Sequence, residues 1–153
     1  MTDALDAASQ RALAVRLFNR TWELLESPRD EAGDREMLAT ALASRLHWEG
    51  IGTDENLAVG DWLVAHVASR LGHADLALEF ASVAHVRATT ADVPLWLVAS
   101  TQEGLARAHA VAGHDDERDQ WAADARSTLT GVTDAEDREL IESQLATVPG
   151  LSG

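Results

Sequence analysis

The fold is decided by the stretch AHVASRLGHADLALEFASVA, which runs from Ala65 to Ala84. Small residues recur in it at the three- and four-residue spacing of a helix, and Gly72 interrupts them where a helix can end in the left-handed conformation. The pattern returns 41 residues later, with Gly113 in the place of Gly72. We therefore predict two pairs of antiparallel helices with close helix contacts. The matching residues of the second stretch are Ala106, His109, Gly113, Ala122 and Ala125.

This repeat resembles the tetratricopeptide (TPR) signature, in which small residues let two helices pack closely and a Gly ends the first of them. The resemblance covers residues 53–130 and departs from the family in its longer period and at Arg118, which replaces a small residue. The chain is also similar to short bacterial TPR-like proteins of unassigned function. That likeness lies in stretches such as Phe18-Asn19-Arg20-Thr21-Trp22, Gly60-Asp61-Trp62 and Leu71-Gly72.

We predict an all-α fold of about seven helices, in one domain over residues 1–153. Three TPR-like hairpins are expected at about 3–50, 53–90 and 93–130, followed by a capping helix at about 133–148. The first helix is predicted from Asp3 to Glu26 and the second after Gly33-Asp34. Asp92 ahead of Pro94 is expected to open the fifth, and a capping box beginning at Thr133 the seventh.

Composition excludes several functions. The 153 residues carry 26 acidic side chains against 12 basic ones, a net charge of −14, and there is no Cys. Thiolate metal sites and disulfides are therefore excluded, and binding to nucleic acid is not expected because its phosphates would be repelled. We predict no membrane span, since no uncharged stretch is long enough, and a cytoplasmic location, since residues 1–6 do not resemble a signal peptide.

In a TPR-like stack the first helix of each hairpin lines a concave groove. We predict a groove that binds a peptide or partner protein, without catalytic residues and without a cofactor. Trp62 and Trp96 are expected to be exposed anchors, and the arginines suggest a peptide with an acidic or C-terminal carboxylate group, so that the partner need not be basic. The groove residues are Arg16, Asn19, Arg20, Trp62, His66, Arg70, Trp96 and Arg107.

Two alternatives stay open. One is a small-molecule sensor or minor enzyme with a His/Trp pocket, for which the candidates are His47, Trp48, Gln102 and His109. The other is a homo-oligomerising domain, with the groove as a homodimer interface. The six His residues lack the spacing of a metal site, so no metal is expected. An open groove at Trp62 and Trp96 would favour the peptide hypothesis, and a closed cavity at His47 and His66 the pocket.

Overall fold

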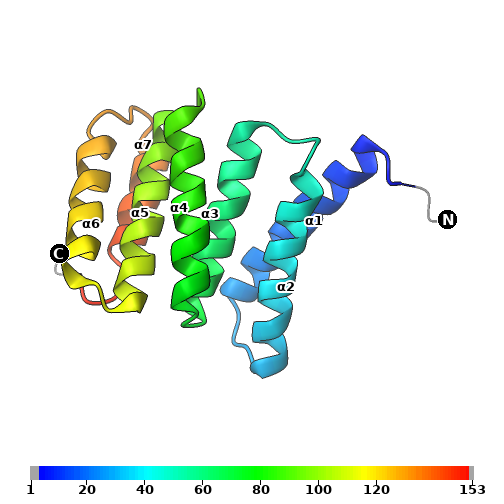
Figure 1. The fold of residues 1–153 in the computed structure, drawn as a ribbon, viewed down its shortest axis with the longest axis horizontal. Helices are drawn as coiled ribbons and strands as arrows, with labels where there is room; N and C mark the ends of the chain where they lie inside the picture. The colour runs from blue at the N-terminus through cyan, green and yellow to red at the C-terminus, as the bar shows by residue number, and fades with distance from the viewer. Residues whose placement is uncertain (1–3, 152–153) are drawn as a thin grey trace.

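The computed structural model describes residues 4–151, which form two layers of antiparallel helices (Figure 1). The predicted all-α fold and its hairpins are confirmed, although residue 3, where the first helix was expected to begin, lies outside the described residues. The helices are α1 (Ala7–Leu25), α2 (Glu31–Trp48), α3 (Asp54–Arg70), α4 (Ala74–Thr90), α5 (Leu95–Ala112), α6 (Asp115–Leu129) and α7 (Ala135–Leu145).

Side-chain caps set the first two helix starts. The Asp6 carboxylate accepts a hydrogen bond from the Ser9 N–H at 2.7 Å, so α1 begins directly after it, at Ala7. The predicted start of α2 after Gly33 is wrong. The Asp30 carboxylate accepts the Gly33 N–H at 2.8 Å, which places that glycine inside the first turn of the helix.

Two later starts also differ from prediction. Asp134, and not Thr133, supplies the side-chain cap of α7, because its carboxylate accepts a hydrogen bond from the Asp137 N–H at 3.0 Å. In α5, Pro94 is itself the N-cap and Asp92 lies outside the helix, which begins at Leu95. In both cases the helix is where the sequence places it, and only the capping residue changes.

The turns that join α3 to α4 and α5 to α6 are built alike. Gly72 and Gly113 both have a φ of 78°, which confirms the left-handed conformation predicted for Gly72. In each turn the N–H after the glycine donates to a carbonyl five residues earlier, at 2.9 Å. The pairs are His73 to Ala68 and His114 to His109. The 41-residue repeat is therefore a repeat of backbone geometry, while its identification as TPR-like stays a prediction.

In Figure 1, α2, α4 and α6 lie toward the viewer and α1, α3, α5 and α7 lie behind them. Asp61 of α3 is buried and joins the two layers, because its carboxylate accepts a hydrogen bond from Arg45 of α2 at 2.6 Å and lies 3.7 Å from Arg87 of α4. Burial raises the pKa of Asp61, and the Arg45 charge opposes that rise. Residues of α7 pack on α5 and α6, with Ile141 and Leu145 against Ala106 and Ala122.

Candidate functional site

The inner faces of α3 and α5 lie side by side in the register that the repeat predicts. The Trp62 Nε1–H donates to Glu103 Oε2 at 3.3 Å, and these residues are 41 positions apart. One stripe of side chains on α3 and the matching stripe on α5 therefore face the same side of the molecule. The stripe residues are Val59, Trp62, His66 and Arg70 on α3, and Trp96, Ser100, Glu103 and Arg107 on α5.

A pocket of about 460 Å³ lies at one end of these two stripes, with α1 and α7 as its remaining walls. We call it the tryptophan pocket. Most of its lining is apolar, and three of its side chains are indoles. The lining residues are Phe18, Trp22, Glu26, Val59, Trp62, Trp96, Leu97, Ser100, Asp137, Leu140, Ile141 and Gln144.

Trp62 forms the floor of the tryptophan pocket and is held on several sides. Its ring stacks on Trp22, with centroids 6.0 Å apart, and on His66, at 5.1 Å. Gly104 leaves room for the indole, because a Cβ there would lie 3.0 Å from Trp62 Cδ1. The side chain is only 6% exposed, so its predicted role as an exposed anchor is wrong. It is nevertheless not enclosed on all sides, since it lines the pocket.

The wall from α1 is aromatic, although a polar one was predicted. Phe18, Trp22 and Glu26 follow one another at four-residue spacing and all line the pocket. Arg16 and Asn19 are exposed and do not belong to that lining. Arg20 points toward α2, where its Nε donates to Glu36 Oε1 at 3.0 Å. Phe18 and Trp22 are therefore lining residues that the predicted groove omits, and Glu26, the acid one turn after Trp22, is the sequence signal that this stripe reaches the surface.

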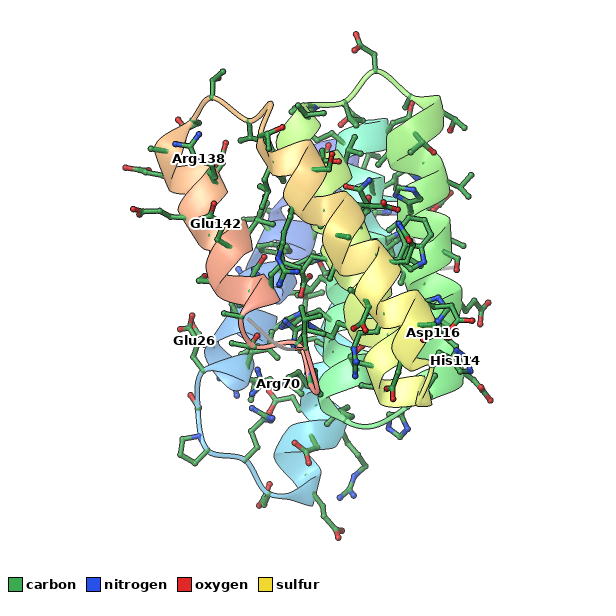
Figure 2. All side chains as sticks on the ribbon, turned by 90° about the vertical axis from the view of Figure 1, so that its left-hand side faces the viewer. Glu26, Arg70, His114, Asp116, Arg138 and Glu142 are labelled. Carbon is green, nitrogen blue, oxygen red and sulfur yellow. The ribbon has the colours of Figure 1, made fainter. Side chains whose placement is uncertain are left out.

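The charges at the tryptophan pocket are negative. Glu26 and Asp137 are its two charged lining residues, and within residues 4–151 neither has an ion-pair partner within 4 Å. Among the described side chains, no Arg or His lines it. Figure 2 shows Glu26 on the same side of the molecule as α7. The pocket therefore combines aromatic walls with unpaired carboxylates.

A buried ion pair separates the tryptophan pocket from the other end of the stripes. Glu103 and Arg107 lie one helical turn apart on α5, and Arg107 Nε donates to Glu103 Oε1 at 2.8 Å. Arg107 also donates to the Gln144 carbonyl and to Thr147 Oγ1, both at 2.8 Å, which fixes the end of α7. Burial raises the pKa of Glu103, and the Arg107 charge opposes that rise. The ion pair therefore has a structural role, because it holds the end of α7 on α5.

The remaining predicted groove residues are His66, Arg70 and Arg107 itself. His66 stacks between the tryptophans and that end of the stripes, and burial lowers its pKa to about 3, helped by the Arg107 and Arg70 charges. Arg70 and Arg107 line a second hollow. The predicted groove is therefore divided: Trp62 and Trp96 share one pocket, and two of the arginines share another.

The four residues proposed for an alternative pocket are not brought together. His47 Nδ1 lies 2.6 Å from Gln10 Oε1 of α1, whereas His66 stacks on Trp22 and Trp62. Trp48 is buried under Arg11, whose guanidinium carbon is 5.2 Å from the ring centroid. Gln102 Oε1 is buried without a hydrogen-bond partner. His109 Nδ1 lies 3.0 Å from the same atom of His114, at the α5–α6 turn.

Neither a cluster of metal-ligating side chains nor a membrane-crossing helix occurs within residues 4–151. No three His, Cys, Asp or Glu side chains gather there as they would around a metal ion. None of the helices in that range is both long enough and apolar enough to cross a bilayer. Comparison of the chain with models of protein families, with curated proteins and with solved structures finds no match.

Proposed function

We propose that this chain is a non-enzymatic, TPR-like interaction module whose tryptophan pocket binds an apolar peptide segment that carries a positive charge. The observation that supports the proposal most is the lining of the pocket, in which three indoles meet two unpaired carboxylates. Aromatic faces attract cations, and tryptophans contribute strongly to the affinity of protein interfaces. A lysine or arginine side chain next to an apolar residue satisfies both parts of this lining.

The charge of the expected partner differs from the one that the sequence suggested. Three of the four arginines assigned to the groove are accounted for elsewhere: Arg20 pairs with Glu36, Arg107 pairs with Glu103, and Arg16 lies outside the pocket lining. The net charge of −14 also favours approach of a basic partner through long-range attraction. We therefore propose a basic peptide in place of an acidic one.

The size of the pocket decides how much of a partner it can hold. About 460 Å³ accommodates one or two large side chains, and Leu140, which is 57% exposed, extends the apolar surface at its mouth. A volume in this range is also typical of small-molecule pockets, so a free organic cation is the competing ligand. The peptide is the stronger proposal because the exposed leucine continues the apolar lining to the mouth of the pocket, where a longer ligand can contact it.

Selection from a random decapeptide library tests the proposal. Wild-type protein should enrich peptides in which Lys or Arg adjoins an aromatic or branched apolar residue, and Trp96→Ala protein should lose that enrichment. Trp121→Ala is the matched control, because Trp121 is another half-buried indole, packed on His85 outside the pocket. Three outcomes would each contradict the proposal. These are enrichment of acidic peptides, equal enrichment by Trp96→Ala and Trp121→Ala, and binding of benzyltrimethylammonium without any peptide enrichment.

A further inference from the structure

The second hollow lies at the opposite end of the α3 and α5 stripes and has a volume of about 500 Å³. We call it the arginine hollow. Figure 2 shows Arg70 close to the segment that follows α7. The hollow is lined by two residues from each of three segments: Ser69 and Arg70 of α3, Arg107 and Val111 of α5, and Thr147 and Pro149 after α7.

Polar groups beside the arginine hollow lack partners inside the described chain. Ser69 is 7% exposed and His66, one turn earlier, is 6% exposed. Neither Ser69 Oγ nor His66 Nδ1 has a hydrogen-bond partner. Buried hydroxyl and imidazole groups are normally hydrogen-bonded, because leaving them unpaired costs free energy. Of these two residues, Ser69 lines the hollow, so a ligand bound there can complete the hydrogen bonding of its hydroxyl.

The charge of the hollow is positive. Arg70 is exposed and has no ion-pair partner within 4 Å among residues 4–151. The charge of Arg107 is offset by Glu103, and no carboxylate of the described chain belongs to the lining. One uncompensated positive charge therefore remains, and it matches a ligand with one negative charge.

The C-terminal ends of α3 and α5 favour a monoanion over a dianion. Both helices reach their C-termini at this hollow, and helix C-termini carry partial negative charge that opposes a dianion more than a monoanion. Val111 and Pro149 add apolar surface, and the volume far exceeds that of an inorganic ion. We propose that the arginine hollow binds a small organic carboxylate, with Arg70 as its charged hydrogen-bond donor and the Ser69 hydroxyl as a second donor.

Titration with 3-methylbutanoate, followed by amide chemical shifts, tests this proposal. This aliphatic acid avoids the aromatic, acidic lining of the tryptophan pocket. We expect saturable shifts centred on Ser69, Arg70, Val111 and Thr147, and at least tenfold weaker binding of the uncharged 3-methylbutanamide. Arg70→Gln should weaken binding of the acid at least tenfold, and Ser69→Ala severalfold.

Two variants outside the arginine hollow serve as controls. Arg126→Gln removes the same charge from an exposed position on α6 and should leave the affinity unchanged, as should Trp96→Ala in the other pocket. Equal binding of acid and amide by the unaltered protein, or equal losses in Arg70→Gln and Arg126→Gln, would overturn the proposal. Tighter binding of inorganic phosphate, or tenfold tighter binding of N-acetyl-alanyl-valine, would also overturn it, because the ligand would then be a phosphate or a peptide terminus.

Discussion

The tryptophan pocket and the arginine hollow occupy opposite ends of the same two helices, yet their chemistry is opposite. One has aromatic walls and unpaired carboxylates, and the other has two arginines and the unpaired hydroxyl of Ser69. Between them lie Trp62, Glu103 and Arg107, joined by hydrogen bonds. Both copies of the repeat contribute to each site, so the contrast arises along the helices: the same faces of α3 and α5 are aromatic at one end and basic at the other.

Removing the charge of Arg107, which lies between the two sites, should cause the largest loss of stability. Arg107→Met leaves Glu103 buried without its counter-charge, and loss of one partner of a buried pair costs about 3–5 kcal/mol of unfolding free energy. Chemical denaturation at pH 7 measures this loss. The loss should shrink at lower pH, where the carboxyl can protonate. In the double variant with Glu103→Gln the loss should be smaller than in Arg107→Met, and an equal loss would contradict the account of the pair.

Burial of His66 should make the stability of the fold depend on pH. The pKa of His66 is about 3 in the folded chain and near 6.5 when unfolded. Below pH 6.5 the unfolded state therefore binds a proton that the folded state does not, and the free energy of unfolding decreases as the pH is lowered. Between pH 7 and pH 5 this group should remove about 2 kcal/mol. His66→Phe keeps an aromatic ring beside the tryptophans and should lose that much less over the same interval. Identical pH profiles of wild type and variant would show that His66 is not buried as described.

Gly104→Ala tests how firmly the floor of the tryptophan pocket is held. Alanine gains about 1 kcal/mol of helix propensity over glycine, whereas overpacking costs about 1–3 kcal/mol. Because hydrogen bonding and stacking hold Trp62 in place, we expect a net loss of about 1 kcal/mol by thermal or chemical unfolding. The penalty should disappear in a Trp62→Phe background, and a stabilised Gly104→Ala protein would mean that the indole moves freely.

The smallest expected effect concerns the rim of the tryptophan pocket. Glu26→Gln should weaken a selected basic peptide severalfold, because it removes one of two unpaired carboxylates. Glu142→Gln is the matched control, since this exposed glutamate of α7 does not line the pocket (Figure 2). Arg20→Gln should leave binding unchanged, because its guanidinium pairs with Glu36 of α2. Isothermal titration calorimetry distinguishes these outcomes, and a loss with Glu142→Gln equal to that with Glu26→Gln would refute a role for the rim.

The helices and the register between α3 and α5 could be predicted from the sequence, whereas the walls of the sites could not. Glycines and small residues report local geometry, so Gly72 and Gly113 marked their turns correctly. The α1 wall depends on how that helix is rotated against α3, which an apolar stripe does not reveal, and Phe18 and Trp22 are therefore missing from the predicted groove. The positions of Glu26 and Asp137 depend on α7 folding against α5 and on the angle between α1 and α7, which are long-range packing outcomes.

The affinity of one selected basic peptide for three proteins shows whether the tryptophan pocket is the binding site. Calorimetric titrations of wild type, Trp96→Ala and Trp121→Ala compare an indole in the tryptophan pocket with an indole outside it. We expect Trp96→Ala to weaken binding at least tenfold, or about 1.4 kcal/mol, and Trp121→Ala to leave it unchanged. Equal affinities for wild type and Trp96→Ala would contradict the claim that this pocket is the binding site.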